Sequence, residues 1–255
     1  MGRYRTGKIL GQGGFGTVFE GYDMENHQPV AIKFIPTNNV LHWVYRGGER
    51  IPQEVDMLLS AKSVSGAVKI IDYWPEQTNY VIVMERPVLC EDLLSYVQSH
   101  GTFTETEAIE LFARIVNTLF QLHCIGIAHR DIKPENILLD LTGSHRIPYP
   151  LIIDFGCASR YKAGKNSRLP SFQGTVIYAP PEWLSHRQIF GQEWDVWGLG
   201  ILLLYTLFGH SFGGWFEGGV DKSRISTDLY SLLERVLCTN PYERISLTQI
   251  CTTLY

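Results

Sequence analysis

Long apolar runs are missing from this sequence, and cysteines are few. The 255 residues include five cysteines, and no two of them form a Cys-x-x-Cys pair, so neither a disulfide framework nor a zinc site is expected. The longest apolar run, residues 199–208, is about half as long as a membrane-spanning helix, and the N-terminus lacks the apolar core of a signal peptide. We therefore predict reduced thiols, a cytoplasmic and/or nuclear location and no membrane partner.

Neither positive nor negative charge is in large excess in this sequence. The formal net charge is −4, and 19% of the residues are charged, so no broad basic surface for nucleic acid is expected. The charged fraction is ordinary for a folded protein, and 45% of the residues are hydrophobic, which is enough for a large core. We take the chain to be a globular monomer of one or two tightly packed lobes.

Apolar periodicity divides the chain into a β-rich first third and a helical remainder. Short apolar runs predict strands at residues 8–10, 18–22, 30–35 and 80–84. Residues 51–61 carry apolar side chains at helical spacing and predict a helix. A β-rich lobe followed by a helical lobe implies a cleft between them.

The remaining helices have clear start signals or continuous apolar character. Thr104 precedes Glu107 at the spacing of a capping box, which predicts a helix that runs to about residue 123. Further helices are predicted at residues 194–208, 226–238 and 246–254.

A glycine-rich segment lies near the N-terminus. Gly11, Gly13 and Gly16 allow backbone N–H groups to close over phosphates without Cβ clashes. A dinucleotide-binding turn is an alternative, but it requires a helix directly after the glycines. Because residues 17–22 alternate like a strand, a strand–loop–strand flap fits better. A purely structural glycine turn remains the other alternative at this point.

Lys33 lies within the predicted strand at residues 30–35 and ends the sequence Val-Ala-Ile-Lys, residues 30–33. A lysine between apolar strand residues points into a cleft, and its burial is costly without an anionic partner. Glu54, on the predicted helix, is placed to be that partner. The alternative is an exposed pair without function.

Residues 129–136, His-Arg-Asp-Ile-Lys-Pro-Glu-Asn, give the strongest signal in the chain. Asp131 is the predicted base that orients and accepts the substrate hydroxyl proton. Lys133 can neutralise charge on a transferred phosphoryl group. The Asn136 amide oxygen suits Mg²⁺, and Asp154, which begins an Asp-Phe-Gly sequence, adds a carboxylate that bridges metal and phosphates.

Taken in order, these motifs resemble the eukaryotic protein kinase family across the whole chain. The resemblance implies an α+β, two-lobed fold in which a five-stranded sheet with one main helix precedes a mostly helical lobe. It implies one catalytic domain at residues 1–255, with the N-lobe at about 1–84, the hinge at about 85–92 and the C-lobe at about 93–255. ATP and Mg²⁺ are the implied cofactors, and serine or threonine hydroxyls of proteins are the implied substrates.

Later residues agree with this resemblance. It pairs Glu182 with Arg244 and makes Asp195 an anchor beneath the catalytic loop. Lys133 together with Thr175 is the serine/threonine pattern. Gly198 stands where kinases commonly have Ser, and we expect it to loosen its helix slightly.

A closer resemblance is to the Pim kinase group. It is carried by residues 85–87, Glu-Arg-Pro, by residues 91–93, Glu-Asp-Leu, and by the double proline before Glu182 and Trp183. This group favours basic residues before the target hydroxyl. The acidic residues that retain this preference are Glu135, Asp92 and Glu91, whereas Ser95 stands where the group tends to carry another acid, so the expected preference is weakened.

The resemblance also defines a nucleotide site. Proline has no N–H, so if Pro87 occupies the donor position of the hinge, only the carbonyl of Glu85 remains to bind adenine. Met84 would lie behind adenine, and Asp92 would meet the ribose, unless it merely starts a helix. The full predicted site comprises Leu10, Gly11, Gln12, Gly13, Gly14, Phe15, Gly16, Thr17, Val18, Ala31, Lys33, Glu54, Glu85 and Asp92.

Two questions stay open. Arg130 directly precedes Asp131, and a phosphate on Ser171 could pair with it. Alternatively, Ser171 is a solvated loop residue and Phe172 orders the segment by packing. The main rival to an active enzyme is a pseudokinase or ATP-binding scaffold, but Lys33 and the catalytic residues are all present.

Overall fold

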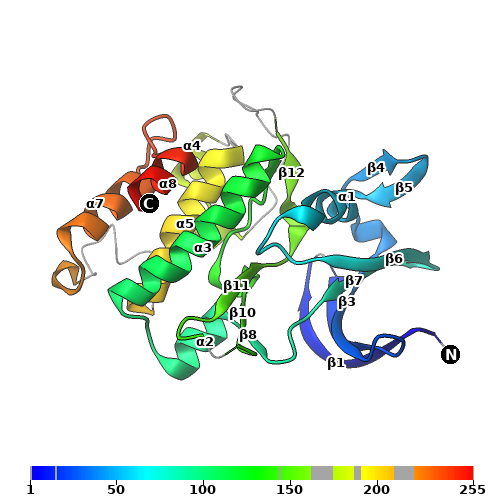
Figure 1. Cartoon of the computed structure of the whole chain (residues 1–255). Helices are drawn as coiled ribbons and strands as arrows, with labels where there is room; N and C mark the ends of the chain where they lie inside the picture. Colours follow the sequence, from blue (N-terminus) through cyan, green and yellow to red (C-terminus); the bar gives the residue numbers. More distant parts are fainter. Residues whose placement is uncertain are drawn as a thin grey trace.

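The computed structural model describes residues 2–14, 16–143, 145–161, 175–186, 191–209 and 221–254. Figure 1 shows two lobes, one built on a strongly twisted sheet and the other mainly on helices. This arrangement confirms the predicted two-lobed α+β fold. The predicted Ser171 phosphate site and Phe172 lie outside the described residues.

The first lobe is built on a five-stranded antiparallel sheet of order β1-β2-β3-β7-β6. Strand β7, between β3 and β6, is buried on both faces. Val81 and Val83 pack against Val30 and Ile32 on one side, and Ile82 joins the main core on the other. The strands are β1 (Tyr4–Gly13), β2 (Gly16–Asp23), β3 (Gln28–Pro36), β6 (Ile70–Glu76) and β7 (Asn79–Glu85).

The helix of this lobe starts later than the apolar pattern predicts. Helix α1 spans Gln53–Ser60, whereas Ile51 belongs to strand β5 (Glu49–Pro52), which pairs with β4 (Trp43–Arg46) in a hairpin. The prediction of a helix from residue 51 is therefore wrong at its start. Pro52 is the last residue of β5 and directly precedes α1. Its missing N–H is tolerated there, because the first N–H groups of a helix have no partner within the helix. Sequence reasoning missed the hairpin, because each strand is only four residues long and is exposed only at the end next to the turn.

The second lobe is helical and has α5 at its centre. Helix α5 (Gly191–Phe208) is buried along nearly its whole length, as its continuous apolar sequence predicts. Thr104 and Glu107 form the predicted capping box at the start of α3 (Glu105–Cys124). The other α-helices are α2 (Leu93–His100), α4 (Pro181–His186), α7 (Thr227–Val236) and α8 (Leu247–Leu254).

Short strands between the lobes carry the catalytic loops. β8 (Cys90–Asp92), β10 (Ile137–Asp140) and β11 (Tyr149–Ile152) form one small sheet, and β9 (Ile127–Ala128) pairs with β12 (Ser159–Arg160) in another. The loop with Asp131 joins β9 to β10, and Asp154 follows β11. Short 3-10 helices are η1 (Thr37–Asn39), η2 (Ala61–Ser63), η3 (Pro134–Asn136), η4 (Phe155–Cys157), η5 (Val176–Tyr178) and η6 (Lys222–Arg224).

A buried ion pair joins α4 to the C-terminal part of this lobe. Arg244 donates from Nη1 and Nη2 to the two carboxylate oxygens of Glu182, each at 2.8 Å. Its guanidinium also lies over the ring of Trp197, 4.9 Å from the centroid. The predicted Glu182–Arg244 pair is confirmed, and its bidentate geometry satisfies both charges without water. Among the described residues, no helix is long and apolar enough to cross a membrane.

Candidate active site

One buried lysine serves two carboxylates at the back of the cleft. Lys33, on β3, donates from Nζ to Glu54 Oε1 at 2.7 Å and to Asp154 Oδ1 at 2.8 Å. The Lys33 and Glu54 side chains are 5% and 7% exposed, and that of Asp154 is 35% exposed. The predicted pairing of Lys33 with Glu54 is therefore confirmed, and the pair is not an exposed one.

The charges of this triad stabilise one another. Burial opposes the ammonium, but the attraction of Asp154 and Glu54 outweighs it and raises the pKa of Lys33 above its usual range. Burial likewise opposes the Asp154 carboxylate, yet Lys33 lowers its pKa to about 2. Burial raises the pKa of Glu54, which Lys33 only partly offsets. At neutral pH, Asp154 is thus the ionised group that faces the open side of the cleft.

The Asp131 carboxylate is held from both sides. Oδ1 accepts from the backbone N–H and the hydroxyl of Thr175, both at 3.1 Å. Oδ2 lies 2.8 Å from Lys133 Nζ and accepts from Asn136 Nδ2 at 2.8 Å. Lys133 also donates to the Thr175 hydroxyl at 2.6 Å. Asp131, Lys133 and Thr175 therefore form one connected cluster with Asn136, the predicted metal ligand.

Asp195, on α5, fixes the backbone that leads into Asp131. Its two carboxylate oxygens accept from His129 N at 2.8 Å and Arg130 N at 2.6 Å, and Oδ2 also lies 2.7 Å from His123 Nε2. These bonds hold Arg130 at a φ of 68°, a left-handed conformation that is uncommon for this residue type. Asp195 is fully buried, so the predicted anchor beneath the loop is confirmed.

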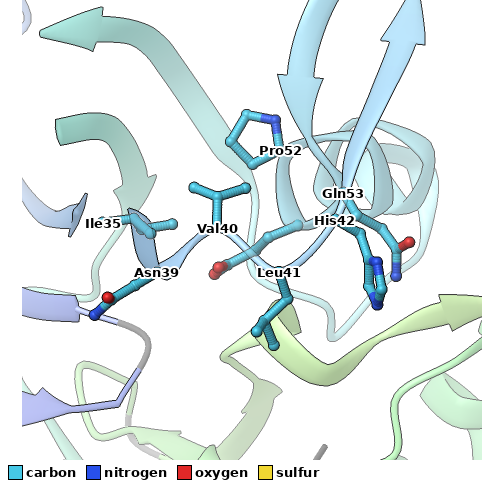
Figure 2. Close-up of a pocket in the computed structure, with 9 residues that line it drawn as sticks. Ile35, Asn39, Val40, Leu41, His42, Pro52 and Gln53 are labelled. Atoms are coloured by element: carbon cyan, nitrogen blue, oxygen red, sulfur yellow. The ribbon is translucent and has the colours of Figure 1, made fainter. Parts of the chain in front are cut away.

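A cavity of about 620 Å³ opens between the lobes, a size that fits a nucleotide. A second pocket, between β3 and the start of α1 (Figure 2), holds only about 30 Å³, which is room for about one water. The large cavity brings together predicted residues from both lobes, namely Leu10, Gly11, Val18, Ala31, Lys33, Glu54, Glu85, Asp92, Asn136 and Asp154.

Several cavity residues carried no motif in the sequence. Lys8, Val68 and Cys90 line the cavity, as does Leu138. The sequence alone could not identify these residues, because they line the cleft without belonging to a recognisable motif. Of the predicted site residues, Phe15 lies outside the described residues, and Gln12, Gly13, Gly14, Gly16 and Thr17 lie at the β1–β2 turn beyond the cavity lining.

The glycines of this turn have different physical roles. A Cβ at Gly16, whose φ is +128°, would lie 2.2 Å from the carbonyl oxygen of Phe34, so packing alone requires glycine there. A Cβ at Gly11, Gly13 or Gly14 would meet no protein atom within 4 Å. Packing within the protein therefore does not require glycine at these three positions, of which Gly11 lines the cavity.

The donor set also fits a divalent cation. Both amide donors of Asn136 are directed at Asp131, to its carbonyl oxygen and to Oδ2, each at 2.8 Å. The Asn136 Oδ1 is therefore the atom of that side chain left for a ligand. It lines the same cavity as the ionised Asp154, and an amide oxygen with a carboxylate is the kind of set that Mg²⁺ prefers.

The hinge side chains are held by neighbouring strands. Arg86 forms an ion pair with Glu20 of β2, at 3.1 Å, and the Glu85 carboxylate accepts from Lys69 N at 2.9 Å. Asp92 caps α2, accepting from Ser95 N at 2.9 Å and from Ser95 Oγ at 2.7 Å. Asp92 thus performs the helix-start role that was its alternative reading, while it also lines the cavity.

Comparison with known proteins decides the family. The family model of the protein kinase domain matches residues 4–255. The chain belongs to the protein kinase family. The matched residues include the Lys33–Glu54 pair, the Asp131 cluster and Asp154.

Relatives of this chain with similar sequences include several serine/threonine-protein kinases. The chain is 35% identical to the serine/threonine-protein kinase pim-2 of Danio rerio, covering 97% of this chain and 83% of that protein. It is 34% identical to the serine/threonine-protein kinase prk-2 of Caenorhabditis elegans, covering 97% of this chain and 56% of that protein. A PAS domain-containing serine/threonine-protein kinase of Mus musculus is 30% identical over 97% of this chain and 18% of its own length. This kinase domain is thus of the serine/threonine type with a Pim-like resemblance.

Proposed function

We propose that this kinase domain transfers the γ-phosphoryl group of ATP to serine and threonine hydroxyls of protein substrates. The observation that carries the proposal is the cluster at Asp131. Lys133 bridges Asp131 and Thr175 at 2.8 and 2.6 Å, so the two residues of the serine/threonine pattern meet at the predicted base. Lys33, Asn136 and Asp154 line the cavity, and Asn136 donates to Asp131 at 2.8 Å. This connection between the cavity and the Asp131 cluster supports a site for phosphoryl transfer.

Asp131 is the proposed base. It accepts a hydrogen bond from the substrate hydroxyl, turns the oxygen lone pair toward the γ-phosphorus, and takes the proton as the new O–P bond forms. The bond from phosphorus to the leaving oxygen breaks, and its electron pair departs with ADP. Lys133, fixed on Asp131 and Thr175, places a positive charge where the transferred oxygens gather negative charge. Positioning and electrostatics then supply most of the rate.

Lys33, Asn136 and Asp154 form the proposed phosphate and metal end of the site. Asn136 and Asp154 would hold Mg²⁺, which would offset the negative charge of the phosphates. Asp154 is ionised, because Lys33 lowers its pKa to about 2. The bonds from Asn136 to Asp131 both use its Nδ2, so its Oδ1 is the atom proposed to bind the metal. Glu54 holds the Lys33 ammonium within reach of Asp154. These three residues are therefore proposed to hold the metal and the phosphates.

Adenine is proposed to bind against the hinge through one hydrogen bond, accepted by the carbonyl of Glu85. Pro87 has no N–H to donate the second bond, and Met84 lines the cavity behind the adenine position. Asp92 is proposed to meet the ribose hydroxyls. Because both its oxygens already accept from Ser95, ribose binding at Asp92 would have to share or replace the Ser95 hydroxyl bond.

The cleft is proposed to favour basic residues near the target hydroxyl. Glu135 lines the cavity, and its Oε2 is buried with no hydrogen-bond partner among the described residues. Such an acceptor calls for a donor, which a substrate arginine or lysine would supply. Glu91 is partly satisfied, because it accepts from Ser99 Oγ at 3.1 Å. Since Ser95 is neutral, the preference for basic residues rests mainly on Glu135.

Further features stay proposals. We propose that residues 1–255 form one catalytic domain that acts as a monomer in the cytoplasm and/or nucleus, on protein substrates and not on nucleic acid. The net charge of −4 and the reduced cysteines support this. A pseudokinase is disfavoured, because the residues it typically lacks are present and correctly paired.

A degenerate peptide library tests activity and preference together. With Mg²⁺ and ATP, the protein should phosphorylate serine and threonine peptides, with a preference for Arg or Lys before the acceptor. The variant Glu135→Gln should flatten that preference and retain activity on neutral peptides. Phosphorylation of tyrosine peptides alone, or none by wild type, would contradict the proposal.

A further inference from the structure

Two arginines from different parts of the chain converge on one carboxylate of α1. Asp56 lies two residues after Glu54, and its side chain is only 12% exposed. Arg46, from the β4–β5 hairpin, donates to Asp56 Oδ1 at 2.5 Å. Arg160, from β12, donates to Oδ2 from Nε at 3.3 Å and from Nη2 at 3.1 Å. Each carboxylate oxygen therefore has a guanidinium of its own.

Ser60 completes this arrangement one turn further along α1. Its Oγ accepts from Arg46 Nη1 at 3.0 Å and from Arg160 Nη2 at 2.7 Å. Asp56 and Ser60 are neighbours on the helix surface because they are four residues apart. We call Arg46, Asp56, Ser60 and Arg160 the α1 clamp. None of these residues belongs to the sequence motifs of the kinase resemblance.

The clamp crosses from one lobe to the other. β12, which carries Arg160, pairs with β9 in the second lobe and lies beside α1 (Figure 1). β9 precedes the loop that holds Asp131, and β12 follows Asp154. A second bond makes the same connection, since Gln53 Nε2 donates to the carbonyl oxygen of Ala158 at 2.8 Å. The outer face of α1 is thus fastened to the segment that leaves the metal site.

The position of α1 decides whether Glu54 reaches Lys33. The two residues are on separate elements, and their 2.7 Å bond exists only while α1 stays against the sheet. The first turn of α1 borders the small pocket of Figure 2, whereas Val55, Met57 and Leu58 pack in the core. The contacts of Asp56 and Ser60 to Arg160 add a polar connection from this helix to the second lobe.

We propose that Asp56 is a positioning residue that, through Arg160, holds α1 where Glu54 can order Lys33, and that it does so without a phosphate. The inference rests on the proposed kinase function. Neutralising Asp56 removes the shared anion and leaves two guanidiniums facing each other, so like charges then push β12 and the hairpin away from α1. Arg46 belongs to the same lobe as α1 and has the smaller role, because it does not bridge the lobes.

Three variants and one matched control test this role. The variants are Asp56→Asn, which keeps the shape of the side chain, Arg160→Gln, and the double variant. Arg146→Gln is the control, because it removes an arginine–carboxylate pair of similar length, 3.2 Å to Glu107, on the surface of the second lobe. For each, kcat and KM for a peptide are measured beside hydrogen exchange of the amides of residues 53–60.

The two single variants should lower kcat by about threefold to thirtyfold with an unchanged peptide KM, and speed exchange in residues 53–60. The kcat of the double variant should be no lower than that of Asp56→Asn, because both changes break the same Asp56–Arg160 contact. Arg146→Gln should behave as wild type. Arg46→Gln should lower kcat less than Arg160→Gln.

Wild-type kcat and exchange in Asp56→Asn would overturn the proposal, as would multiplying losses in the double variant or a larger loss in Arg46→Gln. Failure of the proposed kinase function is distinguishable, because wild type would then show no transfer while the exchange of residues 53–60 still reports the clamp.

Discussion

Gly198 of α5 lies directly against the backbone of Ile132 in the catalytic loop. A Cβ at Gly198 would be 2.7 Å from the Ile132 carbonyl oxygen and 2.8 Å from its Cβ. Helix α5 runs without a break through this position. The glycine that the sequence analysis expected to loosen the helix is therefore a position where the helix backbone packs directly against the loop with Asp131.

The first prediction follows from this contact. Gly198→Ala should lower both the melting temperature and kcat, because the added methyl group must displace Ile132, one residue after the proposed base. Overpacking of this kind costs about 1–3 kcal/mol. Gly200→Ala is the matched control on the same helix. The added Cβ would lie 2.5 Å from the flexible end of Leu237. The variant Gly200→Ala should therefore lower the melting temperature and leave kcat unchanged. Calorimetry and initial rates decide it, and an unchanged kcat in Gly198→Ala would contradict it.

The second prediction concerns Lys33. Lys33→Met should weaken binding of Mg²⁺ and ATP and raise the pKa of Asp154, because the two carboxylates lose their shared cation. Titration calorimetry with Mg²⁺ and ATP measures the effect. Lys8→Met serves as control, since Lys8 lines the same cavity but is not part of the triad, and it should retain binding within a few fold. Equal binding by Lys33→Met and wild type would show that Lys33 does not hold the phosphates.

The third prediction concerns the hydroxyl of Thr175, which joins Asp131 and Lys133. Thr175→Val should lower kcat by about tenfold or more, because a hydrogen bond to a charged group is worth about 1.5–3 kcal/mol. Thr175→Ser should recover most of the rate, since it restores the hydroxyl. The two variants need comparison at saturating peptide and ATP. If serine failed to rescue, the methyl group and not the hydroxyl would matter.

The fourth prediction concerns Pro87. Pro87→Ala should tighten inhibitors that need a hinge N–H donor, by the roughly 0.5–1.5 kcal/mol of one hydrogen bond, and leave those that need only an acceptor unchanged. Affinities of a matched inhibitor pair, measured by calorimetry on both proteins, test this. Parallel changes for both inhibitors would indicate a moved backbone, and a structure with a neighbouring N–H already bound to adenine would refute the one-bond hinge.

The motif residues were predictable because their chemistry restricts their type. Lys33, Asp131 and Asp154 need charge at fixed spacing. Lys33 and Asp154 line one cavity, and Asp131 is hydrogen-bonded to Asn136, which lines the same cavity. The Glu182–Arg244 pair was predictable from the family resemblance for the same reason. Sequence alone therefore gave the fold class and most of the candidate site.

Other features depend on tertiary contacts that leave no local pattern. The strands of the β4–β5 hairpin are four residues each, which is too short for periodicity to reveal them. Asp56 and Arg160 are 104 residues apart in the sequence, and neither belongs to a motif in its own segment. Asp92 shows the same limit, because its capping of α2 and its place in the cavity are both compatible with its sequence.

The central proposal is that Asp131 serves as the base for phosphoryl transfer to serine or threonine. The most direct measurement compares wild type with Asp131→Asn for transfer of labelled phosphate from ATP to a basic serine peptide, beside calorimetric binding of ATP. Wild type should phosphorylate the peptide in the presence of Mg²⁺, and Asp131→Asn should bind ATP normally but lose about 10²- to 10⁴-fold in rate. Near-normal phosphorylation by Asp131→Asn, or a wild type that binds ATP and transfers nothing, would contradict it.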